Sequence, residues 1–198
     1  VRAAFPAAIA AVRNLAGQTV PLWIGGRDVV TAETVPSINP NRPGEILARI
    51  CQTGGAEVES AISAAKKAFP AWRDTPVVER AALLRRAADL ARRQLFELAA
   101  WQVLEIGKQW DQAHADVAEA IDFLDYYAAE ALRFGSPQRL GNMPGEENAL
   151  LYEGRGVAAV IAPWNFPLAI ACGMTAAALV TGNTVVFRPS GLTAIIGR

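Results

Sequence analysis

Residues 157–187 read VAAVIAPWNFPLAIACGMTAAALVTGNTVVF, a strand, a loop, a helix and a second strand in succession. The two expected strands, Val157–Ile161 and Thr184–Phe187, are apolar, which is typical of parallel strands that are buried on both faces. The run Leu168–Val180 between them has the length of a helix and ends at the turn sequence TGN. Together these segments predict a βαβ unit with a right-handed crossover, and therefore an α/β fold.

Ligands of parallel sheets bind at the carboxyl ends of the strands, which here are residues 162–166 and 188–190. In the loop PWNFP, a proline on either side of Asn165 fixes φ and stiffens the support of its side chain. A rigid carboxamide can donate to an oxyanion that develops during a reaction, and Trp164 and Phe166 offer flat apolar walls. The alternative is an ordinary buried βα turn, because prolines and aromatic residues are common in loops.

A basic residue follows the second strand, in the sequence Arg188-Pro189-Ser190. Arginine at a strand end can bind a ribose hydroxyl or a phosphate. The alternative is a solvated arginine with no ligand. The chain has no G-x-G-x-x-G sequence, so the usual dinucleotide fingerprint is absent.

The region 110–134 predicts a long helix with two stripes. Its apolar stripe consists of Val117, Ile121, Leu124 and Ala128. A second stripe, at spacings of 3, 4 and 4, consists of Asp116, Glu119, Phe123 and Tyr127. Two carboxylates beside two aromatic rings can line a cleft. The alternative is that acidic residues near a helix start complement its dipole.

The rest of the chain shows helical spacing in its middle and short strands before it. Helices are predicted over residues 1–16, 58–69, 75–107 and 110–134. Short strands are predicted at residues 22–24, 27–30, 35–39, 46–51 and 150–153. Pro70 is predicted to end the second helix and Thr75 to cap the third, which Gly107 ends. The buried face of the third helix is predicted to carry Leu83, Ala87, Leu90, Leu98 and Trp101.

The composition excludes several classes of protein. Hydrophobic residues make up 52% of the 198 residues, which argues against disorder, and 19 basic against 19 acidic residues argue against a nucleic-acid partner. Cys51 and Cys172 lack metal-ligand spacing, and His114 is the single histidine, so no metal site is expected. Residues 168–180 are too short for a membrane span and residues 1–16 show no signal-peptide cleavage pattern, so we expect a cytoplasmic protein.

Several sequences resemble the opening of one enzyme superfamily. VIAPWNFP (160–167) and TGNTVV (181–186) look like the N-terminal cofactor-binding region of the aldehyde dehydrogenases. Asn39-Pro40 and WIGG (23–26) fit the same superfamily. The resemblance covers nearly all of this chain but only the first part of a family member.

Three further sequences narrow the resemblance. EIGK (105–108), DVAEAIDF (116–123) and Tyr126-Tyr127 resemble the 1-pyrroline-5-carboxylate (glutamate-semialdehyde) dehydrogenases, alone or as a module of a proline-utilisation enzyme. This resemblance implies NAD(P)-dependent oxidation of an aldehyde to a carboxylic acid, with glutamate semialdehyde converted to glutamate in proline catabolism. NAD is the expected cofactor, and NADP is the alternative.

The resemblance also implies a domain division and a fold. Residues 1–138 would form the N-terminal helical part of the cofactor-binding domain, and residues 157–198 the start of its Rossmann-like NAD(P)-binding sheet with the first βαβ unit. Residues 139–156 would form the hairpin that pairs subunits, so the full-length protein is expected to be a homo-oligomer.

Roles for individual residues follow from the same resemblance. Asn165 matches the family's oxyanion-hole asparagine. Phe166 and Glu119 match residues that line or flank the aldehyde tunnel. The residues expected to bind the cofactor are Ile161, Ala162, Pro163, Trp164, Arg188 and Ser190.

The chain departs from the family pattern in two respects. The nucleophilic cysteine and the glutamate base of the family would lie beyond Arg198, so this chain alone is expected to be inactive. The family usually has lysine at the position of Arg188 and glutamate at that of Gly191, and those side chains hold the adenosine ribose in relatives. The alternative function is a non-catalytic nucleotide-binding or oligomerisation fragment of the same superfamily.

Overall fold

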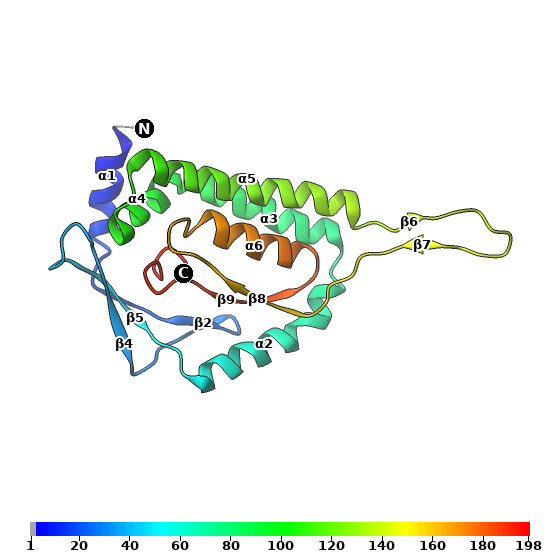
Figure 1. The fold of residues 1–198 in the computed structure, drawn as a ribbon, viewed down its shortest axis with the longest axis horizontal. Coiled ribbons are helices and arrows are strands. Elements are labelled where there is room, and N and C mark those ends of the chain that lie inside the picture. The colour runs from blue at the N-terminus through cyan, green and yellow to red at the C-terminus, as the bar shows by residue number, and fades with distance from the viewer. Residues whose placement is uncertain (1–2) are drawn as a thin grey trace.

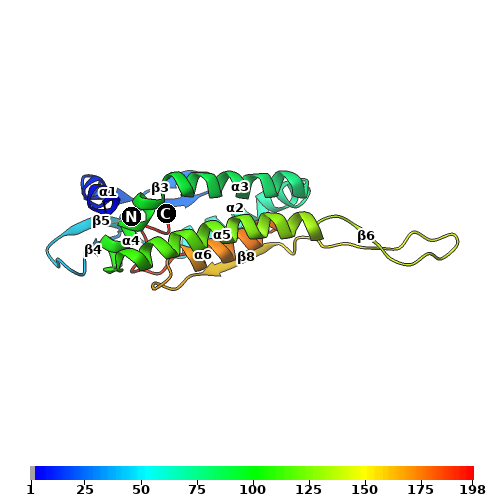
Figure 2. The same ribbon diagram turned by 90° about the horizontal axis from the view of Figure 1, so that it is seen from above.

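The computed structural model describes residues 3–198 (Figures 1 and 2). Its helices are α1 (Ala4–Arg13), α2 (Gly55–Arg73), α3 (Val77–Arg93), α4 (Leu95–Ile106), α5 (Trp110–Phe134) and α6 (Ala169–Val180). Its strands are β1 (Gln18–Val20), β2 (Leu22–Ile24), β3 (Arg27–Val29), β4 (Thr34–Ile38), β5 (Ile46–Cys51), β6 (Gln138–Arg139), β7 (Ala149–Leu150), β8 (Val157–Ile161) and β9 (Thr184–Arg188). The helix predicted over residues 1–16 corresponds to α1, and its first two positions, Val1 and Arg2, lie outside the described residues.

The predicted βαβ unit is confirmed. β8 and β9 pair in parallel, from Val157 opposite Thr184 to Ile161 opposite Arg188, with α6 as the connection. The TGN turn closes the unit, because the Oδ1 atom of Asn183 accepts hydrogen bonds from the backbone N–H groups of Arg155 and Gly156. The mixed α/β class predicted from the sequence is therefore the class observed.

The expectation that both strands are buried on both faces is wrong. In Figure 1 the two strands lie between α6 and α2, and Val160 is buried. Ala159 is nevertheless exposed, and Ile161 keeps 65% of its surface. Each strand has one neighbour within residues 3–198, so each has an open hydrogen-bonding edge and partly uncovered side chains.

The helices form the main core. α5 packs against α3 on one side and α6 on the other, and its predicted apolar stripe, Val117, Ile121, Leu124 and Ala128, is buried. At Gly173 in α6 an added Cβ would stand 3.0 Å from the ring of Phe123, so α5 and α6 approach closely at this glycine. This helical layer supports one side of the βαβ unit.

A second sheet lies near the N-terminus. β1 pairs with β5 in parallel and β4 pairs with β5 antiparallel, giving the order β1-β5-β4. The predicted hairpin of β2 and β3 is confirmed, and its turn residues Gly25 and Gly26 have φ values of 60° and 81°. Positive φ at both turn positions is the geometry of a tight hairpin turn, which glycine adopts at little cost.

The prediction that Pro70 ends the second helix is wrong, because α2 continues through it to Arg73. Proline removes one N–H donor, but its own carbonyl still accepts a hydrogen bond, here from the Asp74 N–H at 3.1 Å. The last turn is also anchored from outside, since Trp72 donates its indole N–H to the Leu179 carbonyl at 2.9 Å.

The single helix predicted over 75–107 is two helices, α3 and α4, separated at Gln94. Thr75 does not cap α3, because its hydroxyl donates back to the Ala71 carbonyl at 2.9 Å. Gly107 does end α4, with φ of 68° in the left-handed region, as predicted. The break at Gln94 follows from its own backbone angles, φ −101° and ψ 12°, which leave the helical range.

The buried face of α3 also differs from the prediction. Leu83 and Leu90 are 40% and 51% exposed, whereas Leu84 and Ala88 are buried. Arg80, whose buried guanidinium is turned inward, lies on the same face as Leu84 and Ala88. Residues one and two turns after Arg80 therefore face the core. Of the other predicted inward residues, Ala87, Leu98 and Trp101 are half-buried.

A hairpin projects from the body between α5 and β8 (Figures 1 and 2). β6 and β7 pair antiparallel at its base, with Gln138 opposite Leu150 and Arg139 opposite Ala149. The strand predicted at 150–153 is wrong beyond Leu150, since pairing stops there and Tyr152 is exposed. No helix of residues 3–198 is both long and apolar enough to cross a membrane.

Candidate functional site at the ends of strands β8 and β9

The structure brings the two predicted strand ends together. Ile161 is the register partner of Arg188, and the Ala162 N–H donates to the Arg188 carbonyl at 3.2 Å. Ser190 follows two residues later, and its Oγ accepts a hydrogen bond from the Leu192 N–H at 3.3 Å. The residues predicted to bind a cofactor thus lie together at the carboxyl ends of β8 and β9.

These strand ends present apolar side chains to solvent. Ile161 is 65% exposed and Trp164 is 53% exposed, while Ala162 is buried and Pro163 half-buried beneath them. Arg188 is exposed, and no carboxylate of residues 3–198 lies within ion-pair distance of it. An uncovered apolar surface beside an unpaired cation can hold a molecule that combines a flat ring with hydroxyl or phosphate groups.

Asn165 sits on the loop between β8 and α6 and is exposed. Its main-chain carbonyl accepts a hydrogen bond from the Nζ atom of Lys108 at 3.0 Å. Its carboxamide makes no hydrogen bond within the part of the chain that the structure describes, so both amide hydrogens remain available to a ligand. Phe166, next to it, is 38% exposed, and Pro167 is buried.

A buried ion pair lies under this loop. Lys108 and Asp116 are 3.4 Å apart between Nζ and Oδ1, with side chains 10% and 0% exposed. Asp116 therefore does not line a cleft, which was one of the two interpretations of its stripe. The residue predicted beside it, Glu119, is exposed. The two aromatic residues of the stripe, Phe123 and Tyr127, stack on each other with ring centroids 5.7 Å apart.

Neither cysteine is placed to act as a nucleophile. Cys51 is buried in β5. Cys172 lies in α6, where burial raises the pKa of its thiol to about 11. The thiolate is the nucleophilic form of cysteine, so at neutral pH this thiol is unreactive.

Glu105 connects three separate parts of the chain. Its carboxylate accepts hydrogen bonds from the N–H groups of Ile195 and Ile196, at 2.8 and 3.0 Å, and from the Ser37 hydroxyl at 3.4 Å. Burial raises its pKa from an ordinary 4.5 to about 7, although the hydrogen bonds act in the opposite direction. Glu105 thereby ties the segment after β9 to α4 and β4.

The contacts of Lys108, Glu105 and Arg80 are not predictable from sequence patterns. Lys108 and Glu105 belong to the EIGK sequence, which indicates a family resemblance only. The left-handed Gly107 between them was the one local signal, because it reverses the chain and turns the next side chain back over the helix end. Each of the three also has a partner far away in sequence, 57 to 100 residues on, which spacing arguments do not reach.

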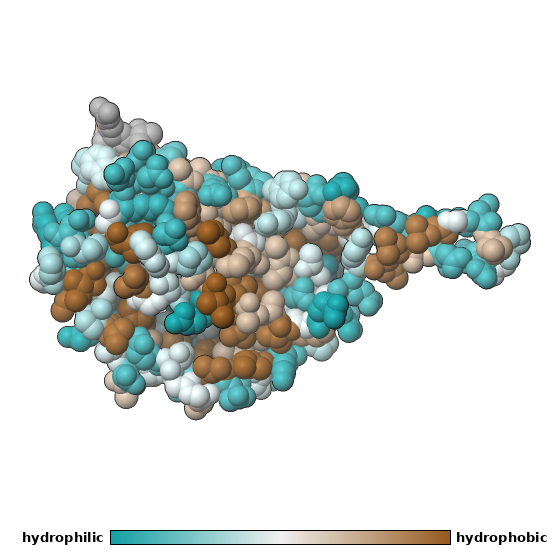
Figure 3. All heavy atoms as spheres, viewed as in Figure 1, coloured by the Kyte–Doolittle hydropathy of each residue, from teal (hydrophilic) through white to brown (hydrophobic). Residues whose placement is uncertain are grey.

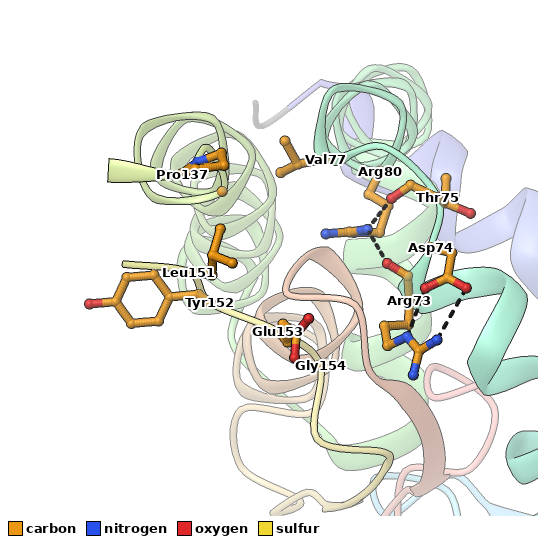
Figure 4. Close-up of a pocket in the computed structure, with 11 residues that line it drawn as sticks. Arg73, Asp74, Thr75, Val77, Arg80, Pro137, Leu151, Tyr152, Glu153 and Gly154 are labelled. Atoms are coloured by element: carbon orange, nitrogen blue, oxygen red, sulfur yellow. Dashed lines mark hydrogen bonds and ion pairs between the residues drawn. The ribbon is translucent and has the colours of Figure 1, made fainter. Parts of the chain in front are cut away.

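A hollow of about 240 Å³ lies elsewhere, at the base of the projecting hairpin (Figure 4). Arg80 donates there to the carbonyls of Val180, at 2.9 Å, and of Arg73, at 3.1 Å, and also to that of Thr75. The Arg73 side chain is paired with Asp74 at 2.7 Å. Because these polar groups bind one another, the hollow is a structural junction rather than a second ligand site.

Among residues 3–198, no cluster of three or more His, Cys, Asp or Glu side chains could hold a metal ion.

Comparison with known proteins identifies the class to which this arrangement belongs. The aldehyde dehydrogenase family profile matches residues 28–197, and the chain belongs to the aldehyde dehydrogenase family. Within the family, the chain is 44% identical over 98% of its length to 1-pyrroline-5-carboxylate dehydrogenase of Bacillus pumilus (strain SAFR-032). It is equally similar to 1-pyrroline-5-carboxylate dehydrogenase 2 of Bacillus subtilis (strain 168), again at 44% identity and 98% coverage.

Solved structures of members of the same family superpose closely on this chain. A 1-pyrroline-5-carboxylate dehydrogenase from Thermus with bound NAD superposes with a TM-score of 0.96 at 45% identity, over 99% of this chain and 38% of that one. Proline utilization A from Bdellovibrio bacteriovorus superposes with a TM-score of 0.96 at 39% identity, over 98% of this chain and 20% of that one. The chain spans 38% of the length of the two curated relatives. The resemblance read from the sequence, N-terminal position included, is confirmed.

Proposed function

We propose that this chain is the N-terminal part of an NAD(P)-dependent aldehyde dehydrogenase that oxidises glutamate semialdehyde to glutamate in proline catabolism in the cytoplasm. The observation that carries the proposal is the pairing of Ile161 with Arg188 at the ends of β8 and β9, with Asn165 on the loop that follows β8. The relatives named 1-pyrroline-5-carboxylate dehydrogenase support the choice of substrate, since they match 98% of the chain.

The residues at the strand ends fit a dinucleotide. Ile161 and Trp164 offer exposed apolar surface to a flat ring, and Arg188 has no acidic partner within residues 3–198. A Cβ added at Gly191 would meet no atom within 4 Å, so the ribose region is open. Ala162 and Pro163 would shape the floor, and Ser190 would offer its hydroxyl hydrogen. NAD, when bound, accepts the hydride that the aldehyde carbon loses.

The aldehyde would bind beside the cofactor, against the loop after β8. The free amide hydrogens of Asn165 would donate to the substrate oxygen as it gains negative charge. Phe166 would provide an apolar wall, and the exposed Glu119 would lie near the entrance. The nucleophilic cysteine and the glutamate base would come from the rest of the protein, because Cys51 is buried and burial raises the pKa of the Cys172 thiol.

The projecting hairpin would pair subunits in a homo-oligomer. Hydrophobic residues lie along this arm in Figure 3, and the exposed fractions are 50% for Leu140, 61% for Met143, 58% for Leu151 and 64% for Tyr152. An arm with so much exposed apolar surface is stabilised when a second copy covers it. We retain the division into residues 1–138, 139–156 and 157–198 as part of this proposal, although β6 begins one residue before the second part.

A direct assay tests the proposed function. The complete protein is mixed with glutamate semialdehyde and either NAD or NADP, and the absorbance of the reduced nicotinamide is followed. We expect turnover of roughly 1 per second or faster. A complete protein that binds NAD without oxidising any aldehyde would instead support the alternative, a non-catalytic nucleotide-binding or assembly role.

A further inference from the structure

The connection between α4 and α5 reaches across to the loop that carries Asn165. α4 ends at Gly107 in the left-handed conformation, and Lys108 follows at once. The Nζ atom of Lys108 donates to the main-chain carbonyl of Asn165 at 3.0 Å, across 57 residues of sequence. Nζ also lies 4.6 Å from the ring centroid of Phe166, within the range of a cation–π contact.

Asp116, in the second turn of α5, contacts both Lys108 and the backbone of the same loop. Its Oδ1 lies 3.4 Å from Nζ of Lys108, and its Oδ2 accepts a hydrogen bond from the Leu168 N–H at 3.3 Å. The Asp116 side chain has no exposed surface, and Oδ1 has no hydrogen-bond partner, so the ammonium group is its source of charge compensation. A buried carboxylate needs such a partner, which makes the pair hard to separate.

The hydrogen bonds from the two side chains to the loop both involve its backbone, and Lys108 also contacts the Phe166 ring. The two side chains bind the carbonyl of Asn165 and the N–H of Leu168, two main-chain groups on either side of Pro167. The carboxamide of Asn165 is left exposed and without a hydrogen bond inside residues 3–198. An arrangement of this kind fixes where the carboxamide is without using its donors.

We propose that Lys108 and Asp116 are positioning residues that orient the Asn165 carboxamide toward the oxygen of the bound aldehyde. This inference rests on the proposed function and adds to it the residues that keep the oxyanion donor in place. Preorganised donors stabilise a transition state because they need not reorient during the reaction. A misplacement of about 1 Å in a reacting geometry can lower a rate by about 100-fold.

The test measures coupling between the ion pair and Asn165 in the complete protein. Lys108→Met and Asp116→Asn are combined, because this double variant removes both charges together and keeps an acceptor for Leu168. Single-turnover hydride transfer at saturating NAD is expected to fall by about 10- to 100-fold. In the Asn165→Ala background the same double change is expected to cost less than about 3-fold, since there is no donor left to position.

A matched control uses an ion pair of similar chemistry, neither member of which forms a hydrogen bond with residues 162–168. Arg13 and Glu45 are 2.9 Å apart with partly buried side chains, and Arg13→Met with Glu45→Gln is expected to leave hydride transfer unchanged. The second variant is Asp116→Asn alone, which is nearly isosteric. It should slow hydride transfer and speed hydrogen exchange in residues 163–168, two measurements that do not depend on the double variant.

The possible results distinguish a failure of the positioning role from a failure of the proposed function. Equal losses with and without the Asn165 side chain would mean that the pair supports the fold only, and the inference would be overturned while the proposed function stands. Unchanged hydride transfer and unchanged exchange in Asp116→Asn would overturn it as well. An Asn165→Ala protein with full activity would remove the oxyanion role itself, and the positioning role with it.

Discussion

Replacing Glu105 by glutamine should change how the stability of the chain depends on pH. Glu105 is 4% exposed, and burial raises its pKa from 4.5 to about 7, so the folded protein keeps a proton there that the unfolded chain releases. The contribution of the protonated group is complete below about pH 4.5 and is lost as the pH rises through about 7. At about 1.4 kcal/mol per pH unit, this interval gives an upper limit of about 3 kcal/mol.

The variant isolates that contribution because glutamine does not titrate. It keeps one acceptor oxygen for the Ile195 and Ile196 amides and loses the other, which lowers stability by about 1–3 kcal/mol at every pH. The free energy of unfolding is measured by urea titration with tryptophan fluorescence at several values between about pH 4 and about pH 8. The difference between variant and wild type should shift in favour of the variant by up to about 3 kcal/mol over this range.

The control is Glu59→Gln, because Glu59 is an exposed residue of α2. Its difference from wild type should stay within about 0.5 kcal/mol at every pH. If the Glu105→Gln difference is equally flat, the Glu105 carboxyl titrates near its ordinary pKa in the folded protein. The reasoning from burial would then be refuted.

Further outcomes follow from the strand-end site and the arm. In the complete protein Asn165→Ala should lower kcat by about 100- to 1,000-fold with unchanged affinity for NAD, which steady-state kinetics and an NAD titration measure. The control, Asn148→Ala in the exposed hairpin, should leave kcat unaltered. Gly191→Glu should lower the ratio of kcat/KM for NADP to that for NAD, because a new carboxylate repels the 2′-phosphate; an unaltered ratio would show that this position does not set cofactor choice. The 198-residue chain without the rest of the protein should not reduce NAD in the presence of glutamate semialdehyde, which a spectrophotometric assay checks. Met143→Glu with Leu151→Glu should give smaller assemblies in analytical ultracentrifugation, and an unshifted sedimentation coefficient would exclude the arm from the subunit contact.

Local patterns predicted the elements that position the candidate site. The apolar strands and the TGN turn predicted the βαβ unit, and the rule that ligands bind at strand ends predicted a site formed by residues 162–166 and 188–190, which the parallel pairing brings together. The spacing of Val117, Ile121 and Leu124 predicted the buried face of α5 for the same reason, because each signal lies within a few residues of its consequence.

Long-range contacts account for what the patterns missed. Leu83 and Leu90 matched an apolar face, but α3 instead turns inward the face that carries Arg80, whose partners lie at the ends of other helices. Asp116 looked like one of a pair of cleft acids, and its burial depends on Lys108 across a loop. A pattern along one helix contains no information about which distant group will meet it.

The inward-facing Arg80 also constrains the order in which the chain acquires its structure. The carbonyl of Val180 that accepts its Nε–H lies 100 residues downstream. Synthesis at about 5–20 residues per second separates the appearance of these two groups by about 5–20 s. During that interval the guanidinium has no α6 carbonyl to bind, so burying it would leave donors unsatisfied. The α3 layer is therefore expected to stay open on the ribosome until α6 emerges, and to close in one step when Val180 arrives.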